Sequence, residues 1–294
     1  MNAKDISLAI CITMIWGLNF SIIKIGLDSL DPFILTGIRF LLCAIPLVFF
    51  IKKPDVSMVY VALYGVLFGV GLWGMVTLGI YFGVSAGVAS LVLQMSAFLT
   101  VIMGVFFLQE EVDAIKIVGF LLALVGIFFI SNLDDGSISY LGLILVSVGA
   151  FSWSITNVIV KKSGVTRVFS FVIYSSLFSP LPLFLIAYLT QGESVFTNFM
   201  QDINYQALFS VAFQVYPTTL FGYWAWNLLI KKHNISNVAP LSLLVPIFGL
   251  LGSFIILDES IGTDKVIACA LIISGLLVSS FSNRVKQYFN KVVV

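Results

Sequence analysis

The sequence has very little charge for its length. Only 10% of its 294 residues are charged, against about a quarter in soluble domains, while 60% are hydrophobic and the mean hydropathy is +1.10. The formal net charge of +1 leaves no basic field to hold nucleic acid and no acidic tail. We therefore expect a chain that folds in lipid and does not bind nucleic acid.

Residues that carry chemistry are also scarce. Cys11, Cys43 and Cys269 lie inside apolar runs without metal-ligand or disulfide spacing, and the single histidine, His233, follows Lys231 and Lys232 in a basic segment. No nucleophile elbow, zinc-protease motif or P-loop is present. We expect no cofactor, no metal, no enzymatic activity and no ATP-driven pumping. For His233 we expect a solvated or positive-inside role.

Long apolar runs dominate what remains. A membrane helix needs about 20 residues to cross about 30 Å of hydrocarbon. Ten runs meet this length, at residues 6–27, 33–51, 58–81, 87–109, 114–132, 139–160, 169–189, 205–230, 237–257 and 265–282. The first run lacks the cleavage site of a secretory signal. The sequence predicts an all-α integral membrane protein with ten transmembrane helices and no soluble domain.

The basic residues give the expected orientation, because lysine and arginine accumulate in short cytoplasmic loops. With the N-terminus inside, twelve of the fifteen are cytoplasmic: Lys4, Lys52, Lys53, Lys116, Lys161, Lys162, Arg167, Lys231, Lys232, Arg284, Lys286 and Lys291. We therefore predict that both termini are cytoplasmic.

The two halves of the chain repeat each other. Three residues of the first span recur in the sixth, where Trp16, Asn19 and Lys24 correspond to Trp153, Asn157 and Lys161. Residues 88–91 and 108–110 likewise correspond to 238–241 and 257–259. Five spans is an odd number, so the second half must be inverted. We predict two inverted five-helix repeats, residues 1–136 and 137–294, an architecture typical of secondary transporters with alternating access.

These stretches resemble the EamA-type branch of the drug/metabolite transporter superfamily over nearly the whole chain. The resemblance rests on WGLNF at 16–20, GIRF at 37–40, ASLVLQ at 89–94, APLSLLVP at 239–246, and Glu259. It is strongest for bacterial exporters of O-acetylserine and cysteine, which also lack the proline that other members have where this chain has Ser96. The resemblance implies a carrier in the bacterial inner membrane that exports small amino-acid-type metabolites. Export of aromatic or other neutral amino acids, and uptake of another small metabolite, are the alternatives.

No acidic residue falls at mid-depth in a predicted span, which disfavours a carrier of organic cations. A zwitterion or neutral polar molecule is instead held by amides, hydroxyls and aromatic faces. The candidate substrate-binding residues are Trp16, Asn19, Trp73, Gln94, Phe98, Trp153, Asn157, Tyr223 and Trp226. Hydrogen bonding or packing between neighbouring helices is the competing interpretation for each. Besides this small-molecule substrate, the expected partner is the bilayer; the oligomeric state stays open, and a monomer suffices.

Four charged residues and two prolines suggest moving parts. Inversion of the second half places Lys24 and Glu259 at the outer face and Lys161 and Glu110 at the inner face, so each pair is a candidate gate. Solvated helix ends, worth about 0 to 1 kcal/mol as pairs, are the alternative. Charge reversal of both partners is the direct test.

Pro240 and Pro246 remove backbone donors within the ninth span and are the candidate hinge. A purely structural kink is the alternative. For Arg39, inside the second span, we expect snorkelling toward the outer interface, with binding of a substrate carboxylate as the other interpretation.

Overall fold

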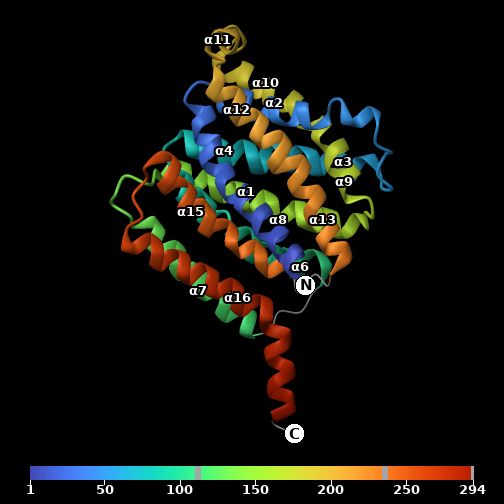
Figure 1. Cartoon of the computed structure of the whole chain (residues 1–294), viewed down its shortest axis with the longest axis vertical. Coiled ribbons are helices and arrows are strands. Elements are labelled where there is room, and N and C mark those ends of the chain that lie inside the picture. Colours follow the sequence, from blue (N-terminus) through green and yellow to red (C-terminus); the bar gives the residue numbers. More distant parts are fainter. Residues whose placement is uncertain (110–113, 234–237, 293–294) are drawn as a thin grey trace.

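The structure is a computed structural model that describes residues 1–109, 114–233 and 238–292. Its elements in these ranges are all helical, without a strand, as the sequence predicts (Figure 1). Up to residue 131 they are α1 (Ala3–Leu27), α2 (Pro32–Ala44), η1 (Leu47–Phe49), α3 (Met58–Val66), η2 (Leu67–Gly74), α4 (Met75–Tyr81), α5 (Ala86–Val92), α6 (Met95–Leu108) and α7 (Ala114–Ser131).

The remaining elements begin at residue 140. They are α8 (Tyr140–Ser163), α9 (Val168–Ser175), η3 (Ser176–Phe178), α10 (Pro180–Gln191), α11 (Ser194–Asp202), α12 (Tyr205–Phe213), η4 (Gln214–Phe221), α13 (Gly222–Lys232), η5 (Ala239–Leu243), α15 (Leu244–Leu257) and α16 (Thr263–Val292). The elements η2 and η4 are π-helical, and η1, η3 and η5 are 3-10 turns.

Side-chain caps fix where several helices begin. The Asn2 side chain accepts a hydrogen bond from the Asp5 N–H at the start of α1, and Asp31 accepts from two N–H groups of α2, which has Pro32 at its first position. At their C-termini, α6 and α15 end in the same way. Both are 14 residues long, and the residues that follow them, Gln109 and Asp258, are left-handed with φ of 55° and 54°. This conformation ends a helix sharply.

Within the described residues, eight helical runs are long and apolar enough to cross a membrane. The outer surface of the bundle is correspondingly apolar: the side chains of Phe50, Leu181 and Phe106 are 81%, 77% and 74% exposed. A water-soluble protein does not leave so much large apolar surface open. The chain is therefore a multi-pass membrane protein.

The two other predicted spans, 205–230 and 265–282, fall on helical segments as well. The first corresponds to α12, η4 and α13, and it includes the polar side chains of Gln214, Thr218 and Thr219. The second falls on α16, which continues past the predicted span and projects from the bundle (Figure 1). That these two segments cross the membrane stays a prediction.

Two helices form the middle of the bundle. α1 packs against α15, α12 and α13, and α8 packs against α6, η2 and α4. Glycines allow the closest of these approaches. A Cβ atom on Gly17 of α1 would lie 2.5 Å from the Phe248 Cβ and 2.6 Å from the Val245 carbonyl oxygen of α15. α7 and α16 pair with each other at one edge (Figure 1).

Candidate functional site

Two π-helical segments lie at the middle of the third and eighth predicted spans. η2 separates α3 from α4, and η4 separates α12 from α13. In η4, Pro217 has no N–H to donate, and the hydroxyl of Thr219 donates to the Gln214 carbonyl oxygen at 2.8 Å. π turns are rare and often accompany functional sites. Sequence reasoning missed this pair of segments, although Pro217 followed by two threonines inside an apolar span was an available signal.

Arg39 of α2 lies between these two segments. Its side chain is fully buried, so our expectation that it snorkels to the outer interface was wrong. The Nε and Nη2 atoms donate to the Thr219 hydroxyl at 3.3 and 3.1 Å, and Nη1 donates to Gln214 Oε1 at 3.4 Å. The guanidinium carbon lies 4.2 Å from the centre of the Trp73 ring of η2. Packing of α2 on η2 and η4 holds the side chain inside the protein.

The acceptors around Arg39 are themselves held in place. Gln214 Nε2 donates to the Ser210 hydroxyl at 3.1 Å, and this hydroxyl donates to the Ile22 carbonyl oxygen of α1 at 2.6 Å. The chain of hydrogen bonds therefore joins α2, η4, α12 and α1. We call the set of Arg39, Trp73, Gln214 and Thr219 the arginine centre.

The arginine centre holds a cation without an anion. In the part of the chain that the structure describes, no carboxylate forms an ion pair with Arg39; its acceptors are one hydroxyl and one amide. The three distances of 3.1 to 3.4 Å exceed the roughly 2.7–2.9 Å usual for a guanidinium facing a carboxylate. A buried charge normally requires a partner.

Several polar atoms on the adjoining helices have no hydrogen-bond partner. Among the described residues they include both amide atoms of Asn19, the Nε1 of Trp73 and the hydroxyl of Thr218. Asn19 is completely buried, and its neighbour Phe20 packs on Trp73 with 6.1 Å between ring centroids. Unpaired buried polar groups are uncommon in native structures and mark places where water, an ion or a ligand binds.

Aromatic rings adjoin the arginine centre. Trp16 of α1 lies 5.6 Å from Tyr223 and 5.1 Å from Trp226, both of α13, measured between ring centroids. The Trp16 Nε1 donates to the Thr218 carbonyl oxygen at 3.0 Å. The structure thus brings together five of the predicted substrate contacts: Trp16, Asn19, Trp73, Tyr223 and Trp226.

Two of the other four predicted contacts pair with neighbouring helices. Asn157 of α8 donates to the Thr100 hydroxyl of α6 at 3.0 Å, and Phe98 packs on Phe120 of α7 with 5.7 Å between centroids. Trp153 is half-buried on α8, and Gln94 lies at the break between α5 and α6. Asn157 and Phe98 thus have the helix-to-helix contacts of the competing interpretation, while the substrate role of all four stays a prediction.

The predicted hinge lies where the ninth span changes its helix type. Pro240 lies in the 3-10 turn η5, and Pro246 is buried in the first turn of α15. In that first turn the missing N–H of proline costs little, because no carbonyl of the same helix awaits it. The matching fourth span is also interrupted, between α5 and α6. Movement at this point stays a prediction.

Of the two predicted gates, the outer one, Lys24 with Glu259, is not closed as an ion pair. Glu259 accepts hydrogen bonds from the N–H groups of Ala86 and Gly87 at the start of α5, at 3.0 and 3.4 Å. Lys24 forms no ion pair with any described carboxylate, while Glu110 lies outside the described residues. Lys161 lies in the last turn of α8. Both gates stay predictions.

Two aspartates form ion pairs near helix ends. Asp135 binds the buried Lys265 ammonium at 2.8 Å. Burial raises the pKa of Asp135, but hydrogen bonds from Lys265 and Ser137 outweigh it and lower this pKa to about 2. Asp5, in the first turn of α1, contacts two residues at the C-terminal end of α13: Lys232 Nζ at 2.9 Å and His233 Nε2 at 2.7 Å. His233 is therefore paired and largely buried, so the solvated alternative of our expectation was wrong, while a positive-inside role stays a prediction.

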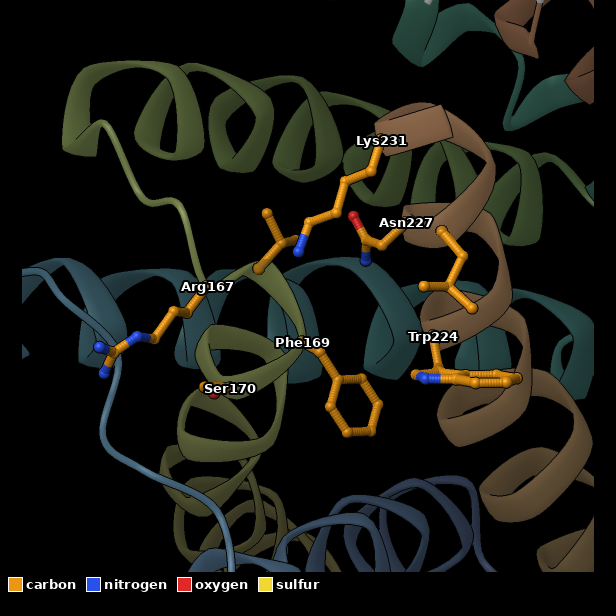
Figure 2. Close-up of a pocket in the computed structure, with 8 residues that line it drawn as sticks. Arg167, Phe169, Ser170, Trp224, Asn227 and Lys231 are labelled. Carbon is orange, nitrogen blue, oxygen red and sulfur yellow. The ribbon is translucent and has the colours of Figure 1, made fainter. Parts of the chain in front are cut away.

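A pocket of about 240 Å³ lies between the first turn of α9 and α13 (Figure 2). Asn227 and Lys231 of α13 point into it together with Phe169, whereas the Arg167 guanidinium points away and donates to the Lys53 carbonyl oxygen. Asn227 Nδ2 donates to the Tyr223 carbonyl oxygen at 2.7 Å. The pocket therefore lies one turn of α13 from the aromatic rings beside the arginine centre.

Similar proteins place these observations in a family. The EamA-like transporter family matches the chain over residues 3–132 and again over 140–281. The chain is 34% identical over 293 residues to the "Probable amino-acid metabolite efflux pump" of Salmonella typhimurium, and 34% identical over 290 residues to the protein of that name from Escherichia coli. These alignments cover 98% and 97% of each chain.

More distant relatives agree with this. The "Uncharacterized transporter YoaV" of Bacillus subtilis is 25% identical over 287 residues, covering 93% of this chain and 95% of its own. A solved structure described as "Crystal structure of protein" has the same fold, with a TM-score of 0.63 and 19% identity over 97% of this chain and 100% of that one. This chain belongs to the EamA-like transporter family.

Proposed function

We propose that this protein is a secondary transporter that exports small amino-acid-type metabolites by alternating access. The arginine centre and the polar and aromatic groups around it carry the proposal, because α1, α2, η2, η4 and α13 gather a buried cation, unpaired amide and hydroxyl groups, and ring faces. This combination suits a small molecule with polar and apolar parts. The names of the Salmonella and Escherichia relatives point to the same class of cargo.

The proposed cargo is small, of the size of cysteine or O-acetylserine. The names of the Salmonella and Escherichia relatives support this size, because amino-acid metabolites are small molecules. The rings of Trp16, Tyr223 and Trp226 favour aromatic amino acids as the second candidate, because ring faces stack on one another.

The proposed architecture is a pair of inverted repeats, residues 1–136 and 137–294. Paired features support it: a π segment in the third and eighth spans, an interrupted fourth and ninth span, and a left-handed residue after α6 and α15. Interrupted helices in corresponding positions of two repeats are typical of transporter binding sites. We place the protein in the bacterial inner membrane with both termini in the cytoplasm, on the distribution of basic residues.

Counterflow in proteoliposomes tests the function. Vesicles that contain the purified protein and unlabelled cysteine should accumulate external labelled cysteine transiently above its equilibrium level, because a carrier exchanges substrate across the membrane without an energy source. Repeating the measurement with O-acetylserine, phenylalanine or leucine inside the vesicles ranks the candidate cargoes by the counterflow that each one drives.

Protein-free vesicles and vesicles loaded with a sugar are the controls. Exchange driven by phenylalanine but not by cysteine or O-acetylserine would assign the aromatic cargo instead. Absence of counterflow with every amino acid and acetylated derivative would overturn the proposal.

A further inference from the structure

We infer that Arg39 binds the carboxylate of the transported molecule, with its guanidinium held against Trp73. This inference deepens the proposed function and rests on it in one respect, because amino-acid-type metabolites carry a carboxylate. The cargo must then carry a carboxylate, which is a planar anion, and Arg39 is its partner in the protein.

The hydrogen bonds of Arg39 leave two of its N–H donors without an acceptor among the described residues. A guanidinium has five N–H donors, and three of them have acceptors among the described residues. Two of the three go to one hydroxyl oxygen, that of Thr219. A carboxylate accepts two parallel N–H bonds from an arginine, so it satisfies the donors that remain.

The position of the ring favours this geometry. With its carbon 4.2 Å from the Trp73 centroid, the guanidinium has one face covered by an aromatic ring, an arrangement that arginine adopts readily. The N–H groups of a guanidinium lie in its plane, so a ring over the face leaves them available at the edge. Gln214 and Thr219 are oriented by their own hydrogen bonds and therefore hold the cation in place.

Asn19 is the second group that we assign to the cargo. Its amide has one acceptor oxygen and a donor NH₂, both unpaired and buried. Phe20, which follows Asn19 on α1, packs on the Trp73 ring that covers Arg39. The amide oxygen suits an ammonium group, and the NH₂ suits a carboxylate or ester oxygen.

A purely structural Arg39 would hold α2 to η4 and have no preference among ligands. Two substitutions separate the interpretations. Arg39→Gln removes the charge, and Gln214→Glu adds an internal carboxylate at the position that now accepts from Nη1 at 3.4 Å. If Arg39 only joins α2 to η4, Gln214→Glu strengthens the contact between these two segments and leaves the preference for acids over amides unchanged. If Arg39 binds the cargo, the carboxylate introduced by Gln214→Glu competes with the cargo for the guanidinium.

The experiment measures ligand-induced thermal stabilisation of the purified full chain in detergent. The probes are matched pairs, alanine with alaninamide, leucine with leucinamide, and propionate with propionamide, with counterflow measured in parallel. In the wild type the acids should stabilise and the amides should not. Arg39→Gln and Gln214→Glu should each weaken the effect of the acids about tenfold or more, since bonds to charged groups are worth about 1.5–3 kcal/mol. Arg39→Lys should keep part of the preference, and the exposed Lys52→Gln should keep all of it.

The outcomes also separate this inference from the proposed function. Transport of amino acids with an unchanged acid-over-amide preference in Gln214→Glu would overturn the carboxylate site and leave the function standing. Arg39-dependent binding of acids without counterflow would overturn the transport function and leave the carboxylate site standing. Should Arg39→Gln fail to fold, Gln214→Glu alone decides, because it keeps the arginine and is expected to melt no lower than the wild type. No stabilisation of the wild type by any acid would overturn the inference.

Discussion

Asn19 and Asn157 occupy matching positions in the repeated sequence and have opposite hydrogen-bond states. The Asn157 amide bonds to Thr100, whereas neither amide atom of Asn19 has a partner among the described residues. An unpaired buried amide costs about 1–3 kcal/mol, while a bond between membrane helices contributes about 0.6–2 kcal/mol. The same chemical group is therefore expected to lower stability in one half and raise it in the other.

This difference gives a prediction with opposite signs at the two positions. Asn19→Leu should raise the free energy of unfolding by about 1–3 kcal/mol, because leucine has no polar atoms to leave unpaired. Asn157→Leu should lower it by about 0.6–2 kcal/mol through loss of the bond to Thr100. Thermal unfolding in detergent measures both, and counterflow should fall in Asn19→Leu despite its greater stability. Destabilisation by both substitutions would contradict the unpaired state of Asn19.

From the sequence, candidate polar and aromatic residues could be chosen, but the neighbours that each side chain contacts in the fold could not be predicted. Asn19, Trp16 and Tyr223 became candidates because each recurs or aligns in both halves. Arg39 was misplaced because snorkelling depends on which neighbours cover a side chain, and Gln214 and Thr219 are more than 170 residues away in sequence. Contacts over such separations leave no mark on local composition.

At the scale of elements, the apolar runs gave the helix positions to within a few residues, except for the end of α16 at Val292, but they did not give the type of helix. Hydropathy registers whether a residue prefers lipid, and this preference is the same in α, π and 3-10 turns. The short helix α11 was also missed, since its length is below that of a span. Its apolar residues Val195, Phe196, Phe199 and Met200 recur at helical spacing, a signal that a search for spans alone passes over.

The contact of α1 with α15 gives a prediction at this scale. Gly17→Leu places a side chain where the nearest atoms of α15 are the Phe248 Cβ, the Val245 carbonyl oxygen and the Gly249 nitrogen, at 2.5, 2.6 and 2.8 Å. None of these atoms is the flexible end of a side chain, so the helices must separate. We expect about 1–3 kcal/mol of lost stability and reduced counterflow.

Gly262→Ala is the matched control, because a Cβ there meets nothing within 4 Å. Equal melting temperatures of Gly17→Leu and the wild type in detergent would contradict the close contact of the two helices.

For the whole molecule, the number of spans in each half decides which side each loop faces. Five spans before residue 136, with the proposed cytoplasmic N-terminus, would place Asp134 outside and Lys52 inside. Both residues are exposed in the structure. In a variant with Cys11, Cys43 and Cys269 replaced by alanine, we predict that Asp134→Cys reacts with an impermeant maleimide in intact spheroplasts. Lys52→Cys should react only after permeabilisation. Labelling of both from the same side would exclude five spans in the first half and, with them, the inverted repeat.

The π segments also affect how the neighbouring helices are read from sequence. An α-helix turns about 100° per residue, so each residue inserted by a π turn puts the two flanks of a span out of phase by about that angle. A single helical wheel drawn over residues 205–230 therefore assigns one flank to the wrong face. Deletion of one residue from η4 would therefore turn the π segment toward α-helix and leave Trp226 beside Trp16 and Asn227 at the pocket. The same deletion within α12 would instead rotate the rest of the span by about 100°.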